Sequence, residues 1–410
     1  MLRLFLFRQC QPEPNGSGFM NSNTLVICGH GMVAQRLLEQ LQDGGHPFSR
    51  IVVLGAEPDA AYNRVLLSSL LAGDAAGIER HYGAPVTRID RDNKRVETGD
   101  GQSFQYDTLV LATGARPAPL GIEGEDLDGV LSFRDLRDTH RLIELSKRYG
   151  RVVVIGGGFL GLEAAEGLRC RGMAVTVLHR NPYLLNRQLD TTGSQLLADS
   201  LEERGMSIRT EHSPSALLGK RFVRAVQLDD DTLISTDLVI TAAGITPNAE
   251  LAREAGLDCG RGVQVDRQMR SSDPDIYALG ECCEIDGQTF GLVDPGYQQA
   301  RVLAGVLRES ASDQVFQSAS QPTRLKISGI PIFSCGQTDD DGQTESIVWH
   351  DYEHNRYCRL LLRDGRLVGT VLFGDTTDGP WYAEQIRLGH DITPWRANLA
   401  FGPEYCEQAA

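Results

Sequence analysis

A glycine-rich segment near the start of the chain has residue types and a spacing suited to holding phosphate groups. Leu25 to Ala34 reads Leu-Val-Ile-Cys-Gly-His-Gly-Met-Val-Ala, so Gly29, Gly31 and Ala34 form the pattern GxGxxA after a short apolar run. In such a turn the first glycine permits a tight bend and the second lets backbone approach a pyrophosphate. The small third residue lets a helix pack on a strand. The helix N-terminus then offers N–H groups and its positive dipole end to the phosphates.

The same arrangement occurs a second time in the chain. Residues 152–172 run from an apolar strand through Gly156, Gly158 and Gly161 into a segment with a helical pattern. A single glycine-rich turn is a common chance match, whereas a repeated strand, turn and helix is a structural unit. We therefore predict two dinucleotide-binding units.

Further matches extend the repeat. A second apolar strand follows each helix, at 51–55 and at 174–178, which completes a strand–helix–strand unit. A later strand in each copy ends in a glycine, Gly114 or Gly244, at nearly the same distance from the first glycine of its copy. The spacing indicates two equivalent domains.

The residues after the second strands differ between the copies. In the first copy Glu57 lies where a carboxylate accepts hydrogen bonds from an adenosine ribose, although a solvated strand end is the simpler alternative. In the second copy the equivalent place holds His179 and Arg180. Two dinucleotides in one chain suggest hydride chemistry between a donor and an acceptor.

The composition excludes several function classes. The chain has 410 residues, of which 41% are hydrophobic and 23% charged, as expected for two or three globular domains. Its net charge of −15 argues against binding to nucleic acid or to an anionic membrane. No apolar run reaches the roughly 20 residues of a membrane span. Residues 1–21 predict a disordered extension rather than a signal peptide.

The nine cysteines give no metal-binding pattern. None are spaced as CxxC, and no set of Cys and His has zinc or iron–sulfur spacing, so we expect no metal centre. Free thiols in a reducing cytoplasm are the default expectation. Cys282 and Cys283 are adjacent, which favours two ordinary buried thiols, with a strained vicinal disulfide as the alternative.

The chain after the second copy first returns to strand and helix patterns. Residues 275–280 predict a buried strand that ends in Gly280, followed by Glu281, and residues 294–308 predict a helix. The polar stretch 310–322 predicts a linker. The next strands, 357–363 and 366–373, flank Asp-Gly, a strong hairpin signal, and a helix over 381–388 follows.

These motifs resemble a family of flavoproteins with two dinucleotide domains. It includes rubredoxin and ferredoxin reductases and the flavin modules of NAD(P)H nitrite and nitrate reductases. The resemblance implies an α/β fold of two Rossmann-like, glutathione-reductase-like domains, the second inserted in the first, plus a small α+β C-terminal domain. The implied boundaries are 22–127 and 248–312 for the FAD-binding domain, 128–247 for the NAD(P)-binding domain and 323–404 for the C-terminal domain.

The resemblance also implies the cofactors and the residues that bind them. The expected FAD-binding residues are Gly29, Gly31, Ala34, Glu57, Arg64, Val86, Thr113, Gly114, Arg116, Gly280 and Glu281. Glu281 replaces the aspartate that the family usually has, and Arg64 has a plain surface arginine as its alternative.

The expected NAD(P)-binding residues are Gly156, Gly158, Gly161, Glu163, His179, Arg180 and Gly244. Glu163 resembles the family's acid near the nicotinamide–flavin contact and is the candidate for a supporting catalytic role, although the helix dipole alone favours an acid there. NADH is the preferred donor. NADPH stays open, because His179 and Arg180 could receive its 2′-phosphate or could simply be a strand cap and a solvated side chain.

Two absences narrow the function. No CxxxxC follows the first turn, so a dithiol relay is not expected and electrons must pass directly to oxygen, a quinone or an external redox centre. Ser68-Ser69 stands where rubredoxin reductases have Ser-Lys, and Asn186-Arg-Gln-Leu-Asp190 also resembles the nitrite and nitrate reductase branch.

We therefore expect an FAD-dependent NAD(P)H oxidoreductase that passes electrons to the catalytic subunit of an assimilatory nitrate or nitrite reductase, or to a small iron–sulfur protein. One alternative is a rubredoxin or ferredoxin reductase. The other is a non-catalytic, flavin-bound regulatory protein, against which the complete second turn argues. The C-terminal domain resembles elements that cover the flavin or pair subunits in relatives.

Overall fold

The computed structural model describes residues 23–58, 78–308, 313–317, 323–325 and 329–407. Arg64, Ser68-Ser69 and the extension 1–21 lie outside the described residues, as does most of the expected linker. No helix in the described part of the chain is long and apolar enough to cross a membrane.

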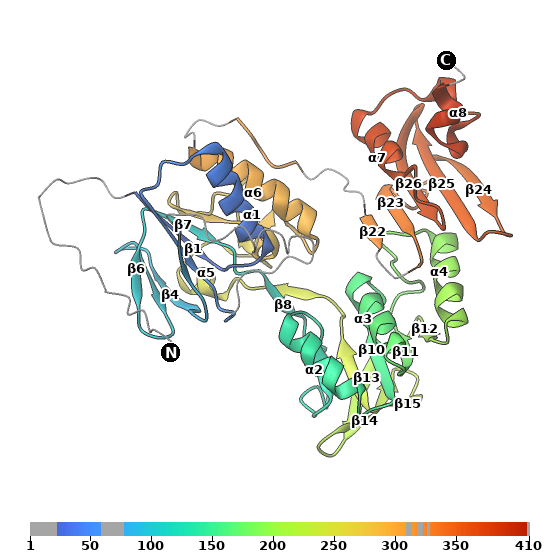
Figure 1. Cartoon of the computed structure of the whole chain (residues 1–410), viewed down its shortest axis with the longest axis horizontal. Helices are drawn as coiled ribbons and strands as arrows, with labels where there is room; N and C mark the ends of the chain where they lie inside the picture. Colours follow the sequence, from blue (N-terminus) through green and yellow to red (C-terminus); the bar gives the residue numbers. More distant parts are fainter. Residues whose placement is uncertain (1–22, 59–77, 309–312, 318–322, 326–328, 408–410) are drawn as a thin grey trace, which may run out of the picture.

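The first unit is a five-stranded parallel sheet with two neighbouring helices (Figure 1). Its order is β19-β7-β1-β2-β3, and every neighbouring pair is parallel. The strands are β1 (Thr24–Cys28), β2 (Arg50–Leu54), β3 (Ile78–His81), β7 (Thr108–Leu111) and β19 (Ile276–Ala278). The helices α1 (Met32–Gly44) and α6 (Val293–Arg308) lie side by side and bury apolar faces in the same core.

The second unit repeats this plan between β7 and β19. Its sheet has the order β12-β11-β10-β16-β9 and is also parallel throughout. The strands are β9 (Val130–Ser132), β10 (Arg151–Ile155), β11 (Ala174–Leu178), β12 (Ser207–Arg209) and β16 (Leu238–Thr241). The helices are α2 (Leu136–Ser146), α3 (Phe159–Cys170) and α4 (Thr191–Glu203). The α/β fold with one unit inserted in the other is confirmed.

The two crossings between the units pair with each other. The outgoing strand β8 (Ala115–Pro117) is antiparallel to the returning strand β17 (Ile245–Pro247). This two-stranded ladder fixes the point where the chain leaves the first unit and re-enters it.

Each unit also contains additional short strands. The first unit carries the antiparallel sheet β4 (Val86–Asp90), β5 (Arg95–Thr98) and β6 (Ser103–Gln105). The second carries β13 (Pro214–Gly219), β14 (Val223–Leu228) and β15 (Leu233–Ser235). After the return come α5 (Glu250–Glu254), β18 (Val263–Gln264), the 3-10 turn η2 (Gly280–Cys282), β20 (Cys283–Ile285) and β21 (Gln288–Thr289).

The C-terminal domain is an antiparallel sheet of order β22-β23-β26-β25-β24 with helices at one side. Its strands are β22 (Thr323–Leu325), β23 (Ile332–Gly336), β24 (Glu345–Asp351), β25 (Arg356–Arg363) and β26 (Arg366–Phe373). The helical segments are α7 (Gly379–Leu388), η3 (Thr393–Trp395), η4 (Leu399–Phe401) and α8 (Pro403–Glu407). The hairpin at Asp364-Gly365 has the expected positive φ at both positions, 50° and 70°.

The two faces of the C-terminal sheet pack against different partners. Alternate residues such as Phe333, Leu360 and Leu372 form a core with α7. Residues on the opposite face of these strands, including Tyr357 and Val371, join the core of the second unit. The domain therefore rests on the second unit, where α4 is its neighbour (Figure 1).

Candidate functional site: two glycine turns

The first turn is shaped by contacts within the protein at Gly29. Its φ is +113°, and a Cβ there would lie 2.1 Å from the main-chain oxygen of Ala112. Its N–H donates to the Leu54 carbonyl at 2.8 Å, which ties the turn to β2. Only glycine fits this backbone, as the sequence pattern predicts.

Gly31 differs because, apart from its two chain neighbours, no atom of the described residues lies within 4 Å of where its Cβ would be. It is the N-cap of α1, with an ordinary φ of −89°, and no side chain caps the helix. The first turn of α1 also holds no acidic residue. The N-terminal end of this 13-residue helix thus has N–H groups without a side-chain cap, an arrangement that fits a pyrophosphate.

The second turn reproduces both features. Gly156 has a φ of +131°, and its Cβ would lie 2.2 Å from the Ala242 oxygen, while beyond its chain neighbours no described atom lies within 4 Å of a Cβ at Gly158. Gly158 is the uncapped N-cap of α3. At Gly161 a Cβ would lie 2.0 Å from the Gly156 oxygen, so glycine permits the helix to pack on the strand. The equivalent Ala34 of the first unit is 1% exposed.

Glu57 and Val86 lie at the edges of the first unit. Glu57 is exposed, three residues after the end of β2, and its main-chain carbonyl accepts from the Gly83 N–H at 2.8 Å. Val86 is the first residue of β4 and packs, half-buried, against the first core. Both positions remain predicted FAD contacts.

Thr113, Gly114 and Arg116 lie where the outgoing and returning chains meet. The Thr113 hydroxyl donates to the Asn248 carbonyl at 2.7 Å, and the Asn248 amide donates back to the Thr113 carbonyl at 2.9 Å. The Arg116 guanidinium donates to Asn248 Oδ1 at 3.1 Å and to Glu250 at 2.6 Å, which lowers the pKa of Glu250. Arg116 thus braces the crossing, a role that the motif alone did not predict.

Gly280 and Glu281 are held by residues far away in the sequence. The Gly280 N–H donates to the buried Gln299 side chain at 2.7 Å. Glu281 forms an ion pair with Arg134, which lies just before α2 in the second unit. Its carboxylate oxygen also lies 3.9 Å from the place of a Cβ on Gly114. The carboxylate therefore bridges the two units near the first turn.

His179 follows β11 and contacts the second glycine turn directly. Its Nδ1 accepts from the Gly157 N–H at 3.1 Å, so the ring fixes the glycine turn rather than standing apart from it. Burial lowers the pKa of His179, and the positive charge of Arg180 adds to this effect. The imidazole is therefore neutral at physiological pH. Arg180 is exposed.

Glu163 is partly buried in the second turn of α3. Three residues on, Glu166 is a buried acid with two cationic partners, Arg169 at 2.8 Å and Arg204 at 3.1 Å. The hydrogen bond from Arg169 is the main cause that lowers the pKa of Glu166. Glu166 therefore has a structural role, and Glu163 remains the predicted supporting residue of the site.

The adjacent cysteines are buried free thiols. Cys282 donates to the Leu111 and Leu279 carbonyls, and Cys283 donates to the Gly280 carbonyl at 3.2 Å. Burial raises the pKa of both thiols, and that of nearby Cys28 to about 12. Protonated buried thiols are poor nucleophiles, which fits the expectation of ordinary thiols.

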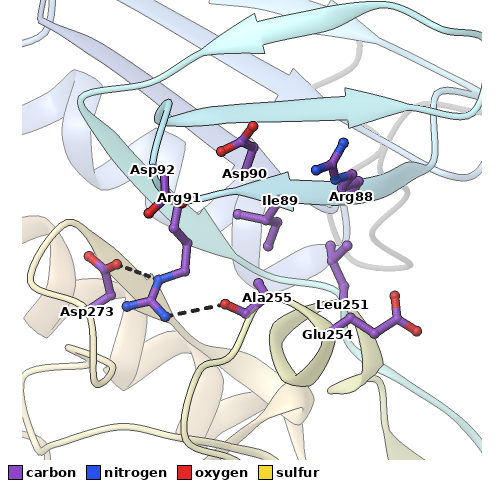
Figure 2. A pocket seen from close by; sticks show the side chains of 9 residues that line it. All are labelled: Arg88, Ile89, Asp90, Arg91, Asp92, Leu251, Glu254, Ala255 and Asp273. Carbon is purple, nitrogen blue, oxygen red and sulfur yellow. Dashed lines mark hydrogen bonds and ion pairs between the residues drawn. The ribbon is translucent and has the colours of Figure 1, made fainter.

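A polar cavity of about 500 Å³ lies between β4 and α5, away from both turns (Figure 2). Arg91 crosses it to Asp273 at 2.8 Å and to the Gly256 carbonyl at 3.1 Å. Arg88, at its rim, pairs with Glu97. Because the other polar lining residues are acids and both arginines are engaged, we assign no phosphate group to this cavity.

His212, Asp229 and Asp230 are the one group of possible metal ligands within the described ranges. Their ligand atoms lie within 4.8 Å of one another, and both aspartates are exposed. The His212 ring lies 3.4 Å from Asp229 Oδ1 and so already has a partner. The absence of a metal centre stays a prediction.

Two parallel sheets, each with a glycine turn at a helix N-terminus, define a protein that binds two dinucleotides. The model of the pyridine nucleotide-disulphide oxidoreductase family matches residues 23–302, and that of the rubredoxin NAD⁺ reductase C-terminal domain matches residues 322–390. The chain therefore belongs to the pyridine nucleotide-disulphide oxidoreductase family. Members of this family bind FAD and NAD(P)H, and the chain is an NAD(P)H-dependent oxidoreductase.

The similar proteins are also reductases or subunits that transfer electrons to a reductase. The chain is 38% identical to a nitrite reductase [NAD(P)H] of Bacillus subtilis, over 91% of this chain and 48% of that protein. It is 36% identical to the assimilatory nitrate reductase electron transfer subunit of the same organism, over 91% and 50%. The chain thus spans about half the length of these relatives. A ferredoxin reductase structure from Rhodopseudomonas palustris is 25% identical, with a TM-score of 0.83 over 95% of this chain and 100% of that one.

Proposed function

We propose that the chain transfers electrons from NADH to the catalytic subunit of an assimilatory nitrate or nitrite reductase. The observation that carries the proposal is the match over 91% of the chain to two relatives with these names. Because the chain spans about half of each relative, we assign to it only the supply of electrons. The free thiols of the described cysteines fit a reducing cytoplasm.

We assign the first turn to FAD and the second to NAD(P)H. Gly29 and Gly31 would hold the FAD pyrophosphate on α1, and Gly156 and Gly158 would hold that of the nicotinamide nucleotide on α3. When bound, FAD supplies a carrier that accepts a hydride and releases electrons singly. Glu163 is the candidate for orienting the nicotinamide, tested by the kcat of Glu163→Gln.

The chain's own thiols take no part in this proposal. Cys28, Cys282 and Cys283 are buried, and their raised pKa values keep them protonated. Electrons would therefore leave directly for an external centre. That centre would be an iron–sulfur cluster on the partner.

Anaerobic mixing of the FAD-loaded protein with NADH or NADPH tests the donor. We expect NADH to bleach the flavin absorbance at lower concentration than NADPH. If Arg180 contacts a 2′-phosphate, Arg180→Ala will weaken the binding of NADPH and leave the binding of NADH unchanged. If neither nucleotide bleaches the flavin, the oxidoreductase proposal fails and a flavin-bound regulatory protein is favoured.

A comparison of acceptors tests the partner. The reduced protein is mixed with the nitrate reductase catalytic subunit, with a ferredoxin and with a rubredoxin, and the reoxidation rates are compared. We expect the fastest rate with the catalytic subunit. A faster rate with ferredoxin would favour the second candidate, a ferredoxin reductase, which the similarity to the Rhodopseudomonas palustris structure supports.

A further inference from the structure

A buried carboxylate joins the second unit to the C-terminal domain. Asp190 is 1% exposed, and its Oδ2 accepts from the Tyr357 hydroxyl at 2.7 Å and from Arg359 Nη1 at 3.0 Å. Burial and the neighbouring carboxylate raise the pKa of Tyr357, so its hydroxyl stays protonated and donates. We call Asp190, Tyr357 and Arg359 the Asp190 clasp.

The same aspartate fixes the start of α4. It is the N-cap residue, and its Oδ1 accepts from the Gly193 N–H at 3.3 Å. Its main-chain carbonyl accepts from the Ser194 N–H at 2.9 Å, and the Ser194 hydroxyl donates to the Leu184 carbonyl at 2.9 Å. The clasp thereby holds both the helix and the segment before it.

That segment lies directly on the second glycine turn. The Leu185 N–H donates to the Gly157 carbonyl at 3.0 Å, and the Leu189 N–H donates to the Leu185 carbonyl at 2.9 Å. Leu184 packs so closely that a Cβ on Gly157 would lie 2.6 Å from its side chain. All three leucines are buried. An unbroken set of contacts therefore runs from the C-terminal domain to the turn.

We propose that Tyr357 and Arg359 are positioning residues for the NAD(P)H site. Through Asp190 they hold segment 184–190 against Gly157, so the C-terminal domain sets the affinity of the second turn for the nucleotide. The proposal rests on the assignment of this turn to NAD(P)H. Backbone N–H groups bind phosphate well only when their geometry is held closely, which supporting contacts provide.

The clasp is not needed merely to keep the domains together. Ile330, Ile332, Val371 and Phe373 of the C-terminal domain are buried in the same core as residues of the second unit. These apolar contacts remain when one hydroxyl or one guanidinium is removed. A buried carboxylate that loses a donor is costly, so we expect Asp190 to shift and to carry the start of α4 and segment 184–190 with it.

The test measures NAD⁺ binding to the FAD-loaded full chain by calorimetry, together with KM and kcat for NADH. The variants are Tyr357→Phe and Arg359→Met. We expect both to raise the Kd for NAD⁺ about 2- to 30-fold and to raise KM, with kcat and FAD content unchanged.

The matched control is Arg363→Met. Arg363 lies on the same strand β25, but its partners Gln337 and Asp341 belong to the C-terminal domain itself. We expect this variant to bind NAD⁺ as the wild type does. Gly158→Ala serves as the control that weakens the site directly.

Each outcome decides a specific claim. If Tyr357→Phe and Arg359→Met lower the thermal midpoint but leave the Kd for NAD⁺ unchanged, the clasp is only structural and the proposal is overturned. If Arg359→Met does not fold, the Kd for NAD⁺ of Tyr357→Phe decides whether the proposal holds. This variant loses a single hydroxyl and is expected to fold. If the wild type itself does not bind NAD⁺, the assignment of the second turn fails instead.

Discussion

The glycines of the two turns fall into two groups by what a side chain would meet. At Gly29, Gly156 and Gly161 a Cβ would lie 2.0 to 2.2 Å from a main-chain oxygen, whereas at Gly31 and Gly158 it would meet no atom of the other described residues within 4 Å, chain neighbours aside. Packing within the protein accounts for the first group. For the second group the pattern predicts the close approach of a ligand to the backbone.

Alanine substitutions separate these two explanations. Gly29→Ala should destabilise the protein by more than about 2 kcal/mol, because of its positive φ and the contact with Ala112. Gly31→Ala should cost about 1 kcal/mol or less in the flavin-free protein but lower its FAD content. Urea unfolding and the ratio of flavin to polypeptide measure both effects. Equal FAD content in Gly31→Ala and wild type would contradict the assignment.

His179 gives the second turn a pH dependence. Its Nδ1 accepts from Gly157 only when the ring is neutral, and its pKa is lowered below the ordinary 6.5. The bond is therefore fully present above about pH 6.5 and is lost as the pH falls from there through the lowered pKa of the folded state. We expect the Kd for NAD⁺ to rise over this interval.

His179→Asn is the control for this pH effect. The asparagine oxygen can accept the same hydrogen bond but does not titrate. The variant should bind NAD⁺ with a Kd that is flat over the interval in which the wild type weakens. A wild-type Kd that does not change below pH 6.5 would refute the role of the ring.

At the scale of single residues, local patterns were predictable and distant pairings were not. The glycines follow from spacing alone. His179 was predicted beside the nucleotide, but its bond to Gly157 joins residues 22 apart, and the Arg134–Glu281 pair joins residues 147 apart. Such partners are set by how the sheets are assembled, which no local pattern contains.

At the scale of elements, the strands and helices of both units follow from hydrophobic period and turn residues. The hairpin at Asp364-Gly365 and the helix that ends at Gly389 also form where the sequence predicts them. The ladder of β8 and β17 was not predicted, because each strand has three residues and its partner lies beyond the whole second unit.

The helix pair of the second unit depends on Glu166. Its side chain is 8% exposed and joins Arg169 of α3 to Arg204 at the end of α4. We expect Glu166→Gln to lower the free energy of unfolding by about 1–3 kcal/mol at pH 7, with FAD content retained.

The pH dependence of this loss identifies its cause. Because the pKa of Glu166 is lowered in the folded state, its contribution is present above about pH 4.5 and is lost as the pH falls through the folded pKa. The difference between wild type and Glu166→Gln should therefore shrink in acid. A difference that stays constant from pH 7 to below the folded pKa would show that the charge is not the cause.

At the scale of the whole molecule, the two equivalent dinucleotide units were predictable from their matching spacing, whereas the insertion of one unit in the other was implied by the resemblance to the flavoprotein family. The surface on which the C-terminal domain packs was not predictable. Its resemblance points to a cover for the flavin or a subunit contact, which stays a prediction, and within the chain its sheet packs on the second unit through residues such as Tyr357 and Val371. Both faces of these strands are buried. The hydrophobic pattern of the strands therefore does not indicate which part of the chain covers each face.

The central claim is that the first turn holds the electron carrier and the second turn delivers the donor. Anaerobic titration of FAD-loaded wild type and Gly158→Ala with NADH, followed by flavin absorbance, tests it most directly. We expect stoichiometric bleaching of the wild type. Gly158→Ala should keep its flavin but need about 10- to 100-fold more NADH for half the maximal reduction rate. Unbleached wild-type flavin, or the same NADH dependence in both proteins, would contradict the claim.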